Sequence, residues 1–171
     1  MGEILLVQGI GAIGYATLAY SYFKEEKKQI LFMQIISYIF FTIHFYMLSG
    51  ITGAICNFIG LFALVAIYLC DKYKWKSKKY IATFFILLLV IVNIATFQNF
   101  FSIFPLIASV IVIVSFLEEN EEAIRGIGII SVVSWLIYAI AYKSYISIPF
   151  EVVTLIEVCV AYVKNTKKEK K

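Results

Sequence analysis

Seven long apolar runs follow one another along the chain, and they limit what it can fold into. The runs are Ile4–Phe23, Ile30–Leu48, Gly53–Cys70, Tyr80–Phe97, Phe101–Leu117, Ile127–Tyr142 and Ser144–Val163. Each is close to the ~20 residues that an α-helix needs to cross a bilayer. Their apolarity is continuous rather than alternating, which excludes a β-barrel, and unpaired backbone is too costly in hydrocarbon. The sequence therefore predicts an all-α membrane protein with seven transmembrane helices.

The composition excludes most other classes of protein. Of 171 residues, 62% are hydrophobic and 15% are charged, against about 45–50% and 25% in soluble domains. We therefore expect no soluble enzyme, no nucleic-acid partner and no disulfide scaffold. The three cysteines, Cys56, Cys70 and Cys159, show no metal-ligand spacing. They are interpreted as small packing residues, and we expect neither a metal nor another cofactor.

The basic residues predict the orientation in the membrane. If the seven helices alternate in direction, 14 of the 15 Lys and Arg residues fall on one side, and only Lys143 falls on the other. Positive loops stay in the cytoplasm, so we expect the N-terminus outside and the C-terminus inside. The net charge of +4 then reflects this bias and a lysine tail that can touch anionic headgroups. The acidic stretch 118–122 is interpreted as a solvated cytoplasmic turn.

An internal repeat relates the two halves of the chain. A shift of 94 positions lays the first three runs on the last three without a gap, and Ile35-Ile36-Ser37 falls on Ile129-Ile130-Ser131. A shift of four helices keeps their direction, so the two copies are parallel. The sequence thus predicts two triple-helix bundles joined by a linker helix. Their bounds are 1–74 for the first bundle, 75–98 for the linker, and 99–171 for the second bundle with its basic tail.

Short motifs add a family resemblance over nearly the whole chain. The stretch Phe41-Thr42-Ile43-His44, then Ser49–Ala54 and Asn57, resembles the YgjV-type bacterial inner-membrane proteins. The second copy, with Ser134–Tyr138, Ser147-Ile148-Pro149 and Glu151, is similar to the SemiSWEET and SWEET sugar transporters. The resemblance implies a SWEET-like three-plus-one-plus-three fold in the bacterial inner membrane.

The resemblance also implies which residues bind substrate. In SemiSWEETs, an aromatic residue on the second helix of each bundle faces an asparagine on the third, sixteen residues later. Phe41 and Asn57 take these positions in the first copy, and Trp135 and Glu151 take them in the second. Glu151 departs from the family asparagine, which weakens the case for a sugar. It favours a cationic or hydroxyl-rich solute, or a proton-coupled step.

Several other residues are candidates for gating. Glu157 shares the last run with Glu151, but six helical residues place the two carboxyls about 120° apart. It is either proton-linked or a protonated acid hydrogen-bonded between helices. His44, aligned with Tyr138, is either a pH-sensitive outer gate or a histidine at the headgroup boundary. Gly11 and Pro105 align and are predicted as hinges.

The predicted function is that of a membrane transporter. A small polar solute (a sugar, an amine or a related metabolite) would cross by alternating access through a central pocket. The alternative is a non-transporting receptor or assembly factor on the same fold. No nucleophile with a base and no phosphate loop is apparent, so an enzyme is not expected. Copies of the chain could associate in the bilayer through small residues, namely Gly50, Gly53 and Gly60.

Overall fold

The computed structural model describes residues 2–97, 99–141 and 147–169, and within these ranges its regular structure is entirely helical. The α-helices are α1 (Gly2–Tyr22), α2 (Lys27–Met47), α3 (Ile51–Tyr73), α4 (Lys78–Ala95), α5 (Ile103–Ser115), α6 (Glu121–Ala141) and α7 (Ser147–Glu169). A 3-10 turn, η1 (Phe100–Ser102), precedes α5. The predicted all-helical class is confirmed. Lys143, Lys170 and Lys171 lie outside the described residues.

The helices differ in how well they suit a bilayer. Among the described residues, α2, α3, α4 and α6 are long and apolar enough to cross a membrane. The segment Phe100–Ser115 is apolar but shorter. The 13 residues of α5 span about 20 Å, against a hydrocarbon core of about 30 Å. The sequence therefore overestimated the helical length of the fifth run.

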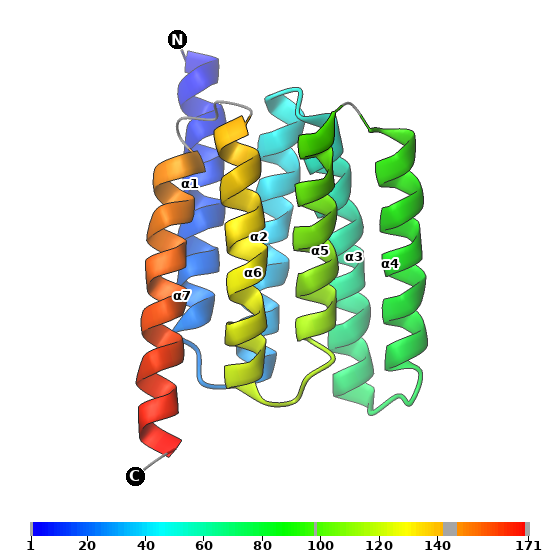
Figure 1. Ribbon diagram of the computed structural model, residues 1–171, viewed down its shortest axis with the longest axis vertical. Helices are drawn as coiled ribbons and strands as arrows, with labels where there is room; N and C mark the ends of the chain where they lie inside the picture. The colour runs from blue at the N-terminus through cyan, green and yellow to red at the C-terminus, as the bar shows by residue number, and fades with distance from the viewer. Residues whose placement is uncertain (1, 98, 142–146, 170–171) are drawn as a thin grey trace.

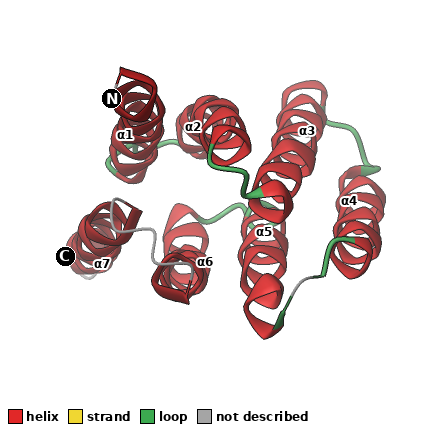
Figure 2. Ribbon diagram, turned by 90° about the horizontal axis from the view of Figure 1, so that it is seen from above, coloured by secondary structure: helices red, strands yellow, loops and turns green. Residues whose placement is uncertain are grey.

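The helices form two rows that face each other (Figure 2). In one row α1, α2 and α3 lie in chain order, and in the other α7, α6 and α5 lie opposite them. Packing is most extensive within each row, while α1–α7 and α3–α5 contacts join the rows at their two edges. Helix α4 lies outside the rows, against α3 and α5. The middle helices α2 and α6 are left to face each other.

Figure 1 shows at which end of the helical bundle the connections between helices lie. The connections 23–26, 74–77 and 116–120 lie at the same end as the C-terminus, and we call this the basic end. The N-terminus lies at the opposite end. Helix α3 stops where Lys74 takes the left-handed conformation, with φ of 55°, which turns the chain towards α4 within a few residues.

The apolar core lies mainly where α2, α3, α4 and α5 meet. Leu31, Leu64, Ile67, Leu89 and Ile113 have no exposed surface there. In contrast, large apolar side chains cover the outside of the bundle, including Leu5, Tyr80 and Ile94. An outward-facing apolar surface of this kind suits lipid rather than water.

The bounds of two helix pairs follow the 94-residue shift, while α1 moved by 94 residues starts before α5. Moving α2 by 94 residues gives 121–141, which are the bounds of α6. Moving α3 in the same way gives a helix that starts and ends two residues before α7. Gly53 packs against the ring of Phe45 and Gly60 against that of Tyr38, so both glycines make contacts inside one chain. Association of two copies through Gly50, Gly53 and Gly60 stays a prediction.

Candidate functional site

A cavity lies between the two rows, bounded by six helices. We call it the central cavity, and its walls are Tyr15, Leu18, Tyr22, Gln34, Tyr38, Phe41, Phe45, Asn57, Val112, Ser131, Val132, Trp135 and Glu151. The volume of the cavity is about 30 Å³. A single water needs about 10–15 Å³ on this measure. The cavity therefore holds two or three such groups, and a larger solute requires the rows to separate.

The four residues predicted to bind substrate come together on this wall. Phe41 of α2, Asn57 of α3, Trp135 of α6 and Glu151 of α7 all line the central cavity. Asn57 is buried and its Nδ2 donates to the carbonyl oxygen of Gly53 over 2.8 Å. This bond is local, so the amide oxygen of Asn57 remains on the wall. The assignment of these residues to binding stays a prediction, and the geometry places them where binding would require them.

Glu151 is the only acidic residue of the wall. It is 4% exposed, and Tyr15 on α1 hydrogen-bonds its side chain. Its Oε2 has no hydrogen-bond partner among the described residues. The ion pairs found in that part of the chain do not include it. A buried carboxyl with an unpartnered oxygen is costly, so Glu151 does not add to the stability of the fold through this oxygen.

Aromatic rings form much of the wall and join the two rows. Phe45 stacks on Trp135 with centroids 5.5 Å apart, which links α2 to α6. Tyr15 stacks on Phe150 of α7 at 5.1 Å and meets Phe41 edge-on at 4.7 Å. Phe45 lies near the end of α2 that is remote from the basic end. The Phe45–Trp135 stack therefore covers the cavity on that side.

Wall residues are paired by the internal repeat. The 94-residue shift relates Leu18 to Val112, Tyr38 to Val132, Phe41 to Trp135, and Asn57 to Glu151, and all eight line the cavity. Matching positions of the two copies thus meet around one central space. This is the arrangement expected when parallel repeats surround a common axis.

The candidate gating residues lie away from the wall. His44 is 1% exposed, its Nδ1 is 2.9 Å from the carbonyl oxygen of Val7, and its ring packs against Gly11. It thus belongs to the α1–α2 contact. Tyr138 packs edge-on against Trp135, next to the cavity. Glu157 is partly buried, and its Oε2 has no hydrogen-bond partner among the described residues.

The two predicted hinges have different surroundings. Gly11 is in the middle of α1, where a glycine weakens a helix. Pro105 is buried in the first turn of α5, where a proline removes no intrahelical hydrogen bond. Pro105, expected as a weak point in the run that starts at Phe101, thus lies in the first helical turn, because α5 begins only at Ile103. Hinge motion at either residue stays a prediction.

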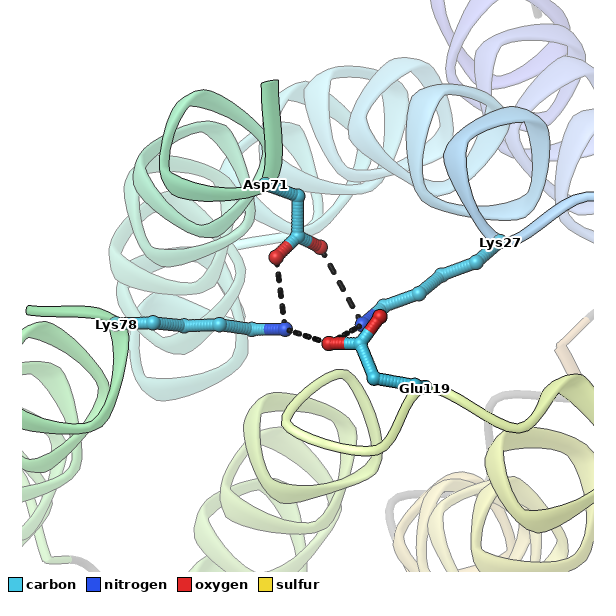
Figure 3. A network of polar contacts seen from close by, with 4 residues as sticks. All are labelled: Lys27, Asp71, Lys78 and Glu119. Carbon is cyan, nitrogen blue, oxygen red and sulfur yellow. Dashed lines mark hydrogen bonds and ion pairs between the residues drawn. The ribbon is translucent and has the colours of Figure 1, made fainter. Parts of the chain in front are cut away.

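A cluster of four charged side chains lies at the basic end (Figure 3). The sequence analysis did not predict it. Asp71 forms ion pairs with Lys27 Nζ at 3.3 Å and with Lys78 Nζ at 2.8 Å, and Glu119 Oε1 forms ion pairs with the same two ammonium groups at 3.0 and 3.1 Å. These residues come from α2, α3, α4 and the α5–α6 connection. Glu119 is therefore part of an ion-pair cluster that spans both rows, rather than a purely solvated turn.

The pKa of Glu119 reflects its contacts with the two lysines. Partial burial of the carboxyl raises its pKa, but hydrogen bonds from Lys27 and Lys78 outweigh this, and the pKa of Glu119 lies below its ordinary value. The side chain is still 78% exposed, so solvent screens the interaction. The cluster contributes more to the relative placement of the rows than to overall stability.

A second tie joins the rows at the basic end. Arg125, near the start of α6, is 2% exposed. Its Nε donates to the carbonyl oxygen of Tyr22 over 3.3 Å, and its Nη2 donates to that of Lys24. The guanidinium thus satisfies carbonyls at the C-terminal end of α1, where a cation is favoured. Because Tyr22 lines the cavity, this contact of Arg125 lies next to the cavity wall on the side of the basic end.

Metal chemistry finds no support in the described ranges. No group of three or more His, Cys, Asp or Glu side chains is placed there to hold a metal ion. The cysteines are free, with Cys56 and Cys70 buried and Cys159 partly buried. The site is a small cavity lined by aromatic and polar side chains.

Within the part of the chain that the structure describes, apolar helices long enough to cross a bilayer and an apolar exterior define a helical membrane protein. The sequence model of Imp-YgjV, described as "Bacterial inner membrane protein", matches residues 5–169. The chain therefore belongs to the Imp-YgjV family of bacterial inner membrane proteins. No curated protein and no solved structure matches it in the same comparisons.

Proposed function

We propose that this protein is a transporter that carries a small polar solute across the inner membrane by alternating access. The solute would be a sugar, an amine or a related metabolite, held in the central cavity. The observation that carries the proposal is that the 94-residue shift relates eight wall positions to one another in four pairs. A cavity shared by matching parts of two repeats is a position where rocking of one repeat against the other changes access.

The two rows supply the moving parts of this proposal. Helices α1–α3 and α5–α7 would act as the two bundles of a SWEET-like arrangement, with α4 as linker. Contacts at both ends support a closed state, namely the Phe45–Trp135 stack at one end, and Arg125 with the ion-pair cluster at the other. Breaking either set would open one side. The basic end would face the cytoplasm, with the N-terminus outside.

Accessibility of the cavity from both sides tests the proposal. Gln34→Cys and Ser131→Cys each place a thiol on the wall, outside the four candidate binding residues. Each variant is treated with a membrane-impermeant thiol reagent in intact spheroplasts and in inside-out vesicles. Native Cys56 is 1% exposed and absent from the wall, so it serves as the internal unreactive control.

The two candidate functions give different labelling patterns. A transporter exposes the introduced thiols to reagent from both sides, because the two open states interconvert. The ties at the basic end favour the alternative, a receptor or assembly factor that admits a partner from one side only. Labelling of both thiols from the outer side alone would therefore contradict transport and support that alternative.

A further inference from the structure

The wall of the central cavity carries a carboxyl group and no basic side chain. Of its thirteen residues, Glu151 is the acid, and none is Lys, Arg or His. Arg125 is engaged with the carbonyl oxygens of Tyr22 and Lys24 at the basic end. The lysines of the ion-pair cluster are held by Asp71 and Glu119. No cation of the described chain is therefore placed to neutralise Glu151.

The rest of the wall suits a cation better than a neutral polyol. Six aromatic side chains line it, namely Tyr15, Tyr22, Tyr38, Phe41, Phe45 and Trp135. The face of an aromatic ring attracts an ammonium group, and the attraction is largest where water is excluded.

Six side chains of this wall bear neutral amide or hydroxyl groups, but some of these groups already have partners within the chain. The six are Gln34, Asn57, Ser131 and the three tyrosines. Ser131 Oγ donates to the Ala108 carbonyl, and Tyr15 hydrogen-bonds Glu151. The Asn57 amide already donates to Gly53. A sugar would bring many hydroxyls into a space with few partners for them, and each unpaired hydroxyl costs free energy.

We propose that the substrate is a small organic cation, whose ammonium group pairs with Glu151 inside a cage formed by the six aromatic side chains. This inference rests on the proposed function and names its substrate class. The unpartnered Oε2 of Glu151 forms an ion pair with the ammonium group, and the rings of Phe41, Phe45 and Trp135 cover the methyl or methylene groups of the cation. The small volume of the closed cavity limits the caged group to the size of a few heavy atoms.

Binding to the purified full-length protein tests this directly. The chain has two tryptophans, and Trp75→Phe removes the exposed one, so that fluorescence reports Trp135 on the wall. Choline is titrated against its uncharged isostere 3,3-dimethyl-1-butanol in a buffer free of amines. Methylammonium is titrated against methanol in the same way, since it fits the closed cavity more easily. Both cations are expected to bind more tightly than their neutral partners.

Variants of the two acids on α7 provide the matched comparison. Glu151→Gln should weaken cation binding by about 30-fold or more, because one member of a buried charge pair is removed. Glu151→Asp keeps the charge and should recover part of the loss. Glu157→Gln removes a carboxyl from the same helix but not from the wall, and affinity should stay unchanged. A near-ultraviolet dichroism spectrum shows that each variant is folded.

The outcomes separate this inference from the proposed function. Equal binding of choline and its isostere, or an unchanged affinity in Glu151→Gln, would overturn the cation cage. Uptake of choline and of glucose into proteoliposomes is measured in parallel. If glucose is carried and choline is not, the cage is wrong while transport stands. If neither is carried or bound, both proposals fail together.

Discussion

A methyl group added at Gly11 should destabilise the protein by collision with His44. A Cβ at this position would lie 2.7 Å from both Cε1 and Nδ1 of the imidazole. Real Cβ contacts do not come this close, so either the ring or α1 has to move. The ring is 1% exposed and its Nδ1 is bonded to the Val7 carbonyl, so it has little room to yield.

The expected magnitude follows from three contributions. Overpacking of a buried contact costs about 1–3 kcal/mol. Displacing the His44–Val7 hydrogen bond costs about 1 kcal/mol more. Alanine gains about 1 kcal/mol over glycine in a helix interior. The net loss in the free energy of unfolding for Gly11→Ala is about 1–3 kcal/mol, which lowers Tm by roughly 2–12 °C for a chain of this size.

Gly9→Ala is the matched control on the same helix. A Cβ at Gly9 meets nothing within 4 Å, so only the gain in helix propensity remains. This variant should raise Tm by about 2–4 °C. The two substitutions are chemically identical and two residues apart, so their opposite signs isolate the contact with His44.

Thermal unfolding of the detergent-solubilised protein measures both effects, and a double variant completes the cycle. In His44→Ala the ring is absent, so adding Gly11→Ala should cost nothing further. Equal stability of the two glycine variants would refute the steric argument. So would a Gly11→Ala penalty that persists in the His44→Ala background.

Three further predictions concern the basic end and the topology. Arg125→Leu leaves the carbonyls of Tyr22 and Lys24 without their donor, and Tm should fall by several degrees, since each buried unpaired group costs about 1–3 kcal/mol. For Glu119, the pKa lies below its ordinary 4.5, so its ion pairs stabilise the fold above pH 4.5 and the contribution is lost as the pH falls through the folded value. Acid titration of Tm should show this loss in the wild type and not in Glu119→Gln. A green fluorescent protein fused after Lys171 should fluoresce, as expected of a cytoplasmic C-terminus; a dark fusion that is still inserted in the membrane would contradict the predicted orientation.

The positions of the helices could be predicted because hydropathy is read directly from consecutive residues of the sequence. Each apolar run of about 20 residues becomes a helix, since the backbone of a buried apolar segment has to bond to itself. The start of α5 was not predicted, because it depends on a side-chain cap and not on hydropathy. The side chain of Asn99 accepts a hydrogen bond from the Phe101 amide over 3.0 Å, which holds the first residues of the run in a 3-10 turn.

Four residues of the cavity wall could be predicted from the sequence through the family resemblance, and the repeat relates them in pairs. The 94-residue shift linked Asn57 to Glu151 and Phe41 to Trp135, and the structure brings these four residues around one space. The aromatic contributions of Tyr15 and Phe45 were missed, because 29 aromatic residues in the chain make any single one uninformative without a fold.

The contacts of the basic end could not be predicted from spacing. Lys27 and Glu119 meet although 92 positions separate them, and Arg125 reaches carbonyl oxygens of α1. Lysines near helix ends are expected in any membrane protein, so their number reveals the side of the membrane and not their partners. The same holds for His44, because a lone histidine gives no periodic signal of the helix that it contacts.

The pairing of Asn57 with Glu151 has a consequence for why both repeats belong to one chain. Two identical three-helix units, assembled as a symmetric dimer, would present either two amides or two carboxyls to the shared space. Two buried carboxyls close together oppose each other's ionisation, and two amides supply no charge. Tandem repeats within a single polypeptide can diverge independently, so one acid can stand opposite one amide. Covalent fusion thus gives this cavity a polarity that symmetry would forbid.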